Sequence, residues 1–299
     1  MTESQQMNLF DSTAEPTPAV RYAPPNVTLR ETPCRSLLNR ADISDYSFNC
    51  YTGCLHGCVY CYARFMQRFH PHDEPWGQFV DVKINAPAVL AKQLRRLPPG
   101  SVFACSACDG WQSIEQHYQL TRRCCQLLLA AGFSLNVLTK SDLVLRDLDI
   151  FTGRPVTLGV TIAVPDEDLA SLWEPAASPV SARLHILKEA RKAGLRTTLM
   201  FAPLLPEISD TPASLLRLFE LAADAHVDRI ITDAHNPRPR VWPSVQHLLQ
   251  THRPDLLPLY SDMLFHPARR KQYLADLDRR IAHAAAQTHL TDDPEKRLC

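Results

Sequence analysis

Three cysteines fall within eight positions of the segment GCLHGCVYCYAR, at Cys54, Cys58 and Cys61. This C-x3-C-x2-C spacing lets a short loop, closed by the start of a helix, turn all three sulfurs toward one centre. A structural zinc ion normally takes four protein ligands, and the fourth would be His56, Cys50 or a distant residue. A cubane iron–sulfur cluster has four irons, so three thiolates would leave one iron free to bind another molecule. The spacing predicts a metal centre, either a zinc ion or such a cluster.

The composition of the 299-residue chain narrows the classes of protein that can carry this motif. Lys plus Arg and Asp plus Glu number 32 each, so no net charge draws the protein toward polyanions, and contact with nucleic acid needs a local patch. The sequence shows no run of about 18 apolar residues and no basic-then-apolar leader, which predicts a cytoplasmic protein without a membrane span. In a reducing compartment, ten cysteines are more often metal ligands or reactive thiols than disulfides.

Strand-like and helix-like segments alternate along most of the chain, which predicts an α/β fold. Residues 1–40 are rich in Pro, Thr, Ser and Glu, and we expect a flexible N-terminal arm there. Six apolar segments predict strands, at residues 46–50, 101–105, 134–140, 156–164, 195–201 and 228–234. Helical patterns between them indicate a parallel sheet covered by helices. We therefore predict a partial (β/α)6 barrel over residues 41–235 and a C-terminal helical extension over residues 236–299.

Polar segments follow the first three predicted strands. They are Cys54–Cys61, Cys105–Gln112 and Thr139–Asp142. After the second of these segments, the sequence predicts a single helix over residues 114–132 that ends at a glycine. In parallel β/α folds the loops at the carboxyl ends of the strands converge, and the chemistry collects there. We expect the three segments to share one mouth.

The aromatic residue inside the cysteine motif gives the sequence a specific resemblance. C-x3-C-x-aromatic-C, with Tyr60 before the last cysteine, resembles the signature of the radical S-adenosylmethionine (radical SAM) enzymes. The resemblance implies that Cys54, Cys58 and Cys61 hold a [4Fe–4S] cluster whose open iron binds the amino and carboxylate groups of S-adenosylmethionine. It also implies a reductant such as flavodoxin or ferredoxin. One electron from the cluster would cleave S-adenosylmethionine to methionine and a 5′-deoxyadenosyl radical that abstracts hydrogen.

A closer resemblance, over most of residues 46–235, is to the spore photoproduct lyase-like family, whose members are often labelled DNA repair photolyases. It rests on separate segments: the tyrosines on both sides of Cys61, ACD followed by IE at 107–115, TK at 139–140, EP at 174–175 with Arg183, and APLLP at 202–206. The resemblance implies lyase-type repair of a thymine lesion in DNA. The alternatives are a radical enzyme that modifies RNA, a peptide or a small molecule, and a non-catalytic metal-binding scaffold.

The same resemblance implies roles for five residues around S-adenosylmethionine. Tyr60 and Tyr62 match tyrosines that lie near the cofactor. Lys140 matches the lysine that binds its carboxylate, a pairing that opposite charges favour. Ala202 would offer a backbone contact to the adenine, and Thr161 is the hydroxyl of the fourth strand that would face the cofactor.

The sequence departs from the family pattern after the second strand. Many radical SAM enzymes bind the methionine amino group with a Gly-Gly-Glu stretch, which CSACDG replaces here. Asp109 is either a substitute acceptor for that amino group or a cap for the next helix. Spore photoproduct lyase has a cysteine near this strand end that returns a hydrogen atom. Cys105 and Cys108 are the candidates for that role, although free cysteines more often pack in cores.

Basic residues near the end of the chain bear on the question of nucleic acid. Lys and Arg side chains contact phosphates by charge, independently of base sequence. The candidates either contact DNA or form a solvated surface, and they are Arg238, Arg240, Arg269, Arg270 and Lys271.

Overall fold

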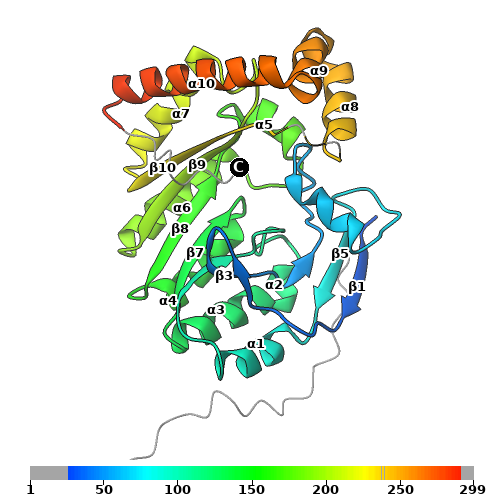
Figure 1. Ribbon diagram of the computed structural model, residues 1–299. Helices are drawn as coiled ribbons and strands as arrows, with labels where there is room; N and C mark the ends of the chain where they lie inside the picture. Colours follow the sequence, from blue (N-terminus) through cyan, green and yellow to red (C-terminus); the bar gives the residue numbers. More distant parts are fainter. Residues whose placement is uncertain (1–25, 237, 239, 291–299) are drawn as a thin grey trace, which may run out of the picture.

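The computed structural model describes residues 26–236, 238 and 240–290. Its main element is a seven-stranded sheet with the strand order β10-β9-β8-β7-β6-β3-β2. Six of these strands pair in parallel: β3 (Ser44–Phe48), β6 (Ser101–Ala104), β7 (Ser134–Thr139), β8 (Val156–Thr161), β9 (Arg196–Leu204) and β10 (Arg229–Ala234). They are the six strands predicted from the sequence. The prediction of an α/β fold with a partial barrel of six β/α units is confirmed (Figure 1).

Helices cover the outer face of this sheet, as the alternation predicts (Figure 1). They are α1 (Ala86–Leu94), α3 (Leu120–Ala130), α4 (Leu148–Phe151), α6 (Val180–Lys192) and α7 (Pro212–Asp224). Two connections carry further short elements, η2 (Asp142–Asp147) after β7 and α5 (Glu167–Trp173) after β8. The strands pack closely enough that a Cβ at Gly159 in β8 would lie 2.9 Å from the Thr198 carbonyl oxygen. The core therefore lies between the sheet and its helices.

The predicted arm over residues 1–40 is wrong in its second part. Residues 1–25 lie outside the described residues, but β1 (Thr28–Thr32) pairs in parallel with β5 (Phe79–Lys83). The short strand β4 (Tyr51–Thr52) completes this second sheet, and β2 (Asn39–Ala41) pairs antiparallel with β3. The strands β1 and β2 are short and polar, so their own side chains give no apolar signal. Open backbone groups on the edges of neighbouring strands are what order them.

The single helix predicted over residues 114–132 is also wrong, because the chain forms two helices there. Between α2 (Glu115–Tyr118) and α3, Gln119 takes a left-handed conformation with φ of 49°. The buried Glu115 carboxylate accepts hydrogen bonds from the backbone N–H groups of Thr121, at 3.1 Å, and Arg122, at 2.9 Å. It satisfies two donors that the first turn of α3 leaves open. A side chain therefore replaces the continuous helical hydrogen bonding.

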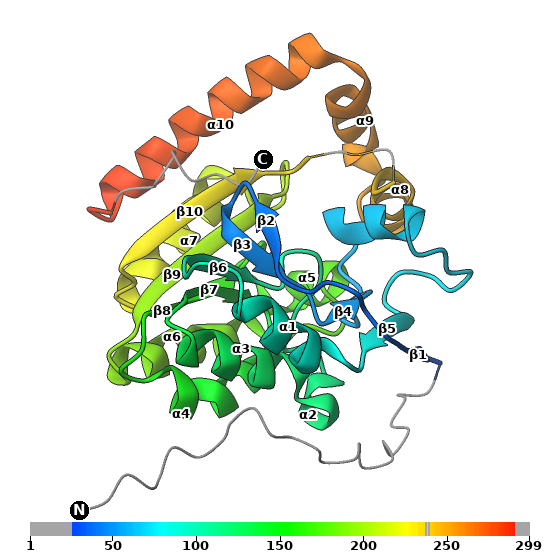
Figure 2. The same cartoon turned by 60° about the horizontal axis from the view of Figure 1, so that its bottom comes forward.

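The C-terminal part consists of helices, and each of them has a proline in its first turn. The elements are α8 (Trp242–His252), η3 (Pro254–Leu256), α9 (Leu257–Phe265) and α10 (Pro267–Gln287), and α10 lies against α7 (Figure 2). Arg280 of α10 pairs with the buried Asp210 at 3.1 Å, which ties α10 to the loop after β9. Within the described ranges, the longest helices are too short or too polar to cross a membrane.

Candidate active site

A cavity of about 430 Å³ lies at the carboxyl ends of the parallel strands. Its walls come from the three polar segments that were predicted to share one mouth, together with the ends of β8, β9 and β10. The structure places every site residue predicted from the sequence on these walls: Cys54, Cys58, Tyr60, Cys61, Tyr62, Cys105, Cys108, Asp109, Lys140, Thr161 and Ala202. One site therefore unites residues that lie far apart in the chain.

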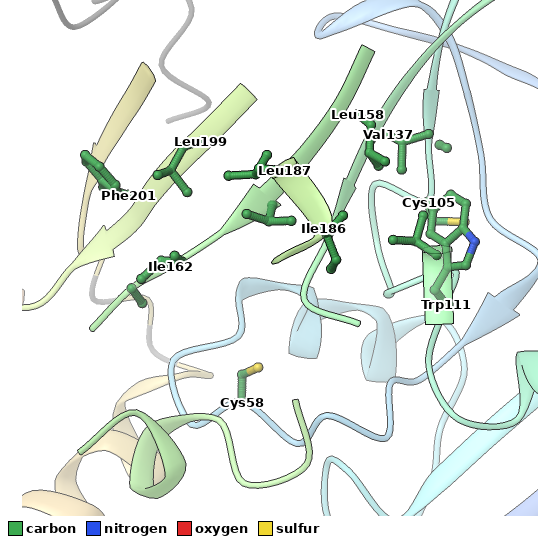
Figure 3. Packing of buried hydrophobic residues seen from close by; sticks show 14 of the residues in the cluster. Cys58, Cys105, Trp111, Val137, Leu158, Ile162, Ile186, Leu187, Leu199 and Phe201 are labelled. Carbon is green, nitrogen blue, oxygen red and sulfur yellow. The ribbon is translucent and has the colours of Figure 1, made fainter. Parts of the chain in front are cut away.

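A buried glutamine that was not predicted as a site residue hydrogen-bonds to the backbone of the cysteine loop. Gln112 accepts a hydrogen bond from the Leu55 N–H at 2.8 Å and donates one to the Gly53 carbonyl at 3.2 Å. Gly53 and Gly57 have φ values of 91° and 62°, which glycine adopts without strain. Figure 3 shows Cys58 on this loop, apart from the strands, whereas Cys105 lies beside Trp111. The loop can therefore present its sulfurs to the cavity with little backbone strain.

The donor set of this loop fits a metal centre in its chemistry. Cys54, Cys58 and Cys61 are free thiols on one wall of the cavity. Burial raises the pKa of the Cys58 thiol to about 12 although Lys140 opposes the shift, and a bound metal centre would favour the thiolate by its positive charge. Within the part of the chain that the structure describes, three His, Cys, Asp or Glu side chains nowhere surround a point closely enough for a single ion.

Lys140 lies on the cavity wall beside a carboxylate that had no predicted role. Its Nζ is 4.0 Å from Glu174 Oε1 and 5.7 Å from the centre of the Tyr60 ring. The Tyr60 hydroxyl also donates a hydrogen bond to Glu174. Glu174 is buried, and burial raises its pKa while Arg183 opposes that shift. Lys140, which was predicted to bind the carboxylate of the cofactor, is therefore only loosely paired with a carboxylate of the protein, Glu174.

Arg183 connects this group to the strand ends. Its NH1 lies 2.5 Å from Glu174 Oε2 and donates to the Thr161 carbonyl at 3.0 Å, and its Nε donates to the Ser178 carbonyl at 2.7 Å. The side chain is buried. The EP and Arg183 segments of the resemblance thus form one buried ion pair that fixes the end of β8, where Thr161 lies.

Asp109 uses its oxygens within the protein. It accepts hydrogen bonds from the Thr139 hydroxyl at 2.8 Å, the Lys140 N–H at 2.8 Å and the Trp111 N–H at 2.9 Å, and His56 Nε2 lies 3.0 Å away. Although burial opposes it, the nearby His56 together with these donors lowers the pKa of Asp109 to about 2. These contacts make Asp109 a link between the loop after β6 and the end of β7; it is not the cap of the next helix, because the N-cap of α2 is Ile114.

The loop after β6 is braced by a second residue that was not predicted. Asn49 accepts a hydrogen bond from the Ala107 N–H at 2.7 Å, and the Cys108 sulfur lies 3.7 Å from the same oxygen. The Tyr62 hydroxyl donates to the Ser106 carbonyl. A hydrogen bond with Cys105 and burial raise the pKa of the Cys108 thiol well above its usual value. Asn49 lies inside the strand predicted at residues 46–50, and its type alone gives no signal of this role.

Aromatic side chains lie on η1 (Tyr62–Arg68) and just after it, and two of them, Tyr62 and Phe65, line the cavity. The rings of Tyr62 and Phe65 stack with centroids 6.5 Å apart, and Phe69 meets Phe65 edge-on at 6.4 Å. Tyr62 is 52% exposed and Phe69 is 65% exposed, which is unusual for such large apolar groups. Among the predicted basic residues, Arg238 lines the cavity, whereas Arg270 donates to the His235 carbonyl at 3.1 Å.

Comparison with known protein families assigns the chain to a class that agrees with this fold and this cavity. Residues 48–219 match the family described as the radical SAM superfamily. The chain belongs to the radical SAM superfamily. This family uses a [4Fe–4S] cluster and S-adenosylmethionine.

Relatives and solved structures add detail to this assignment. An uncharacterized protein of Mycobacterium tuberculosis is 31% identical over 290 residues, which cover 89% of this chain and 83% of that protein. An uncharacterized protein of Methanocaldococcus jannaschii is 32% identical over 166 residues, covering 55% of this chain and 62% of that protein. A spore photoproduct lyase with bound AdoMet and dinucleoside spore photoproduct has a TM-score of 0.60 at 18% identity, covering 75% of this chain and 66% of the lyase. At that identity the likeness concerns the fold.

Proposed function

We propose that this protein is an enzyme that cleaves S-adenosylmethionine reductively in the cavity described above, with Cys54, Cys58 and Cys61 as the ligands of the [4Fe–4S] cluster. The observation that carries the proposal is the position of three free thiols and Lys140 on one cavity wall. When bound, the cluster and S-adenosylmethionine supply an electron and a 5′-deoxyadenosyl radical. A flavodoxin or a ferredoxin is the expected reductant.

The residues of the chain seat the cofactor and exclude water. Lys140 binds the carboxylate of S-adenosylmethionine by its opposite charge. The lysine is available for this contact because its Nζ is only loosely paired with Glu174, at 4.0 Å. Ala202 lies with Met200 and Ile231 in a small apolar cluster on the last two strands, which suits the face of an adenine. Tyr60 and Thr161 complete this part of the wall.

The substrate that we propose is a thymine lesion in DNA. The half-buried ring of Phe65 on the cavity wall and the exposed ring of Phe69 against it support this proposal, because unstacked bases bind on aromatic side chains. Arg238 at the same mouth offers a charge for the phosphates. The likeness to a lyase that was solved with a dinucleoside spore photoproduct agrees with this choice.

Reconstitution tests the cofactor chemistry. The protein is incubated with iron and sulfide without oxygen, and dithionite and S-adenosylmethionine are then added. We expect an iron–sulfur absorption band and 5′-deoxyadenosine as product. Replacing Cys54, Cys58 and Cys61 together with alanine should abolish both, whereas Cys34→Ala, which changes a thiol outside the cavity, should leave both unchanged. A protein that binds zinc and makes no 5′-deoxyadenosine would contradict the proposal and support a metal-binding scaffold.

A defined lesion tests the substrate. Duplex DNA with one spore photoproduct is added to the reconstituted protein, and conversion of the lesion to two unlinked thymines is followed by nuclease digestion, chromatography and mass spectrometry. We expect Phe69→Ala to weaken binding of this DNA by about 5- to 100-fold, since stacking on an aromatic contributes about 1–3 kcal/mol per base. Phe265→Ala, which removes an exposed ring from α9 outside the cavity, is the control. If 5′-deoxyadenosine forms but the lesion persists, the substrate is instead an RNA, a peptide or a small molecule.

A further inference from the structure

Two buried N–H donors lie beside the cysteine loop, on side chains that do not line the cavity. They are Arg64 Nε and Trp76 Nε1, and within the described residues neither has a hydrogen-bond partner. A buried donor without a partner costs free energy, so such groups are rare in folded proteins, and a redox role or a bound ion is one explanation for them. Two of them beside one loop indicate an acceptor that the loop itself holds.

The indole ring of Trp76 packs against the cysteine loop. Trp76 and Cys54 belong to one group of buried apolar residues, and Cys61 packs against the same group. The next residue, Gly77, approaches the loop so closely that a Cβ there would lie 2.8 Å from Gly57 Cα. The ring is therefore held next to two of the three proposed ligands of the iron–sulfur cluster.

Arg64 connects the loop to this ring. One guanidinium N–H donates to the Cys58 carbonyl at 3.3 Å, and the guanidinium carbon lies 6.0 Å from the centre of the Trp76 ring. The backbone N–H of Arg64, on η1, donates to the Cys61 carbonyl at 3.5 Å. Burial lowers the pKa of Arg64, whereas the charges of Cys61 and Cys58 oppose this shift. Since arginine stays protonated in proteins, the loop carries a fixed positive charge beside its thiols.

We propose that Arg64 and Trp76 set the reduction potential of the iron–sulfur cluster, Arg64 by its charge and both side chains by N–H donation to cluster sulfurs. This inference rests on the cluster ligands proposed above. The potential of such a cluster depends on nearby charge, on hydrogen bonds to its sulfurs and on its exposure to solvent. Because the cluster gains negative charge when it accepts an electron, a cation and N–H donors favour the reduced form more than the oxidised form. The two side chains therefore make the cluster easier to reduce.

A redox titration followed by electron paramagnetic resonance tests the charge of Arg64 in the reconstituted protein. Arg64→Met keeps an apolar side chain that packs against Trp76 but removes the charge. At a fixed solution potential, we expect its ratio of reduced to oxidised cluster to be about tenfold lower than in the wild type, a shift of about 59 mV for one electron. Arg64→Lys, which keeps the charge, should restore most of this ratio. A ratio in Arg64→Lys as low as in Arg64→Met would contradict the role of the charge.

The same titration tests the indole donor. Trp76→Phe removes one neutral donor and keeps an aromatic ring, so we expect a smaller fall of about threefold, since a neutral hydrogen bond is roughly half as strong as a charge-assisted one. Two control variants should keep the wild-type ratio: Arg68→Met changes an exposed cation on η1, and Trp242→Phe removes an indole on α8 outside the cavity. Wild-type ratios in both Arg64→Met and Trp76→Phe, with the cluster fully loaded, would overturn the proposal.

Urea unfolding of the protein without its cluster separates this role from packing. A side chain that acts on the cluster stabilises the protein little when the cluster is absent, so the midpoint of Arg64→Met should not fall below that of the wild type. If Arg64→Met does not hold the cluster, a lower midpoint would assign Arg64 to the folding of the loop and overturn its electrostatic role. A wild-type protein that binds no reducible cluster would contradict the proposed function, whereas a reducible cluster with unchanged variants would contradict this inference alone.

Discussion

Two buried carboxylates, Glu174 and Glu115, have similar neighbours and different positions. Each accepts a hydrogen bond from a tyrosine hydroxyl and pairs with an arginine: Glu174 with Tyr60 and Arg183, Glu115 with Tyr51 and Arg146. The remaining contacts of Glu115 are backbone N–H groups at the start of α3. Those of Glu174 include Lys140 on the cavity wall.

The difference shows how one kind of network serves two purposes. Around Glu115, the charges and backbone donors are consumed in holding α2, α3 and η2 together. Around Glu174, the arginine anchors the carboxylate, and the lysine at 4.0 Å is 18% exposed to the cavity. We infer that the Glu115 network acts on stability alone, whereas the Glu174 network acts on stability through Arg183 and on cofactor binding through Lys140.

Removing the anchor should have the largest effect. Arg183→Met leaves Glu174 as a buried charge without its arginine, and we expect the free energy of unfolding to fall by about 3–5 kcal/mol. Arg191→Met is the matched control on the same helix, because Arg191 forms an exposed pair with Asp228 and should contribute less than about 1 kcal/mol. Urea unfolding measures both. Equal losses in the two variants would contradict the role of Arg183 as an anchor.

Removing the loosely held cation should affect binding. For Lys140→Met we expect the affinity for S-adenosylmethionine to fall about 10- to 100-fold, since a hydrogen bond to a charged group contributes about 1.5–3 kcal/mol. The midpoint of urea unfolding should change little. Calorimetric titration of the reconstituted protein measures the affinity, and Lys92→Met, at an exposed position of α1, is the control. An unchanged affinity would show that the carboxylate of the cofactor binds elsewhere.

The smallest expected effect is a pH dependence from Glu115. Burial raises the pKa of Glu115 above its usual value of 4.5, against the opposing hydrogen bonds of Tyr51, the Arg122 and Thr121 N–H groups, and the charge of Arg146. The folded state therefore holds a proton that the unfolded state has lost, and stability falls as the pH rises from 4.5 through the folded pKa. We expect a slope below about 1.4 kcal/mol per pH unit. Glu115→Gln should remove this slope in urea unfolding between pH 4 and 7, without changing the affinity for S-adenosylmethionine; a retained slope would assign it to another group.

The parts that sequence predicted well have strong local signals. Most of the six parallel strands are rich in apolar and β-branched residues, and glycines and prolines lie between them, so their order along the chain already indicates a β/α fold. The cysteine motif and its tyrosines likewise carry their chemistry in their spacing. The sequence did not predict β1, β2 and β4, because such short strands are ordered by their partners. The break at Gln119 was missed because it depends on the burial of the Glu115 carboxylate and its bonds to the start of α3, which the residue types alone do not indicate.

The sequence by itself determined the donor set, the fold class and the family resemblance, because these depend on residue types and on their spacing along the chain. Only the tertiary structure decided which residues meet. It brought Glu174 and Arg183 to Lys140, gave Asp109 its internal donors, and placed Cys105 and Cys108 on the wall of the same cavity. Such contacts arise where loops from separate strands converge, and the energy of a buried charge or thiol depends on those neighbours more than on its own type.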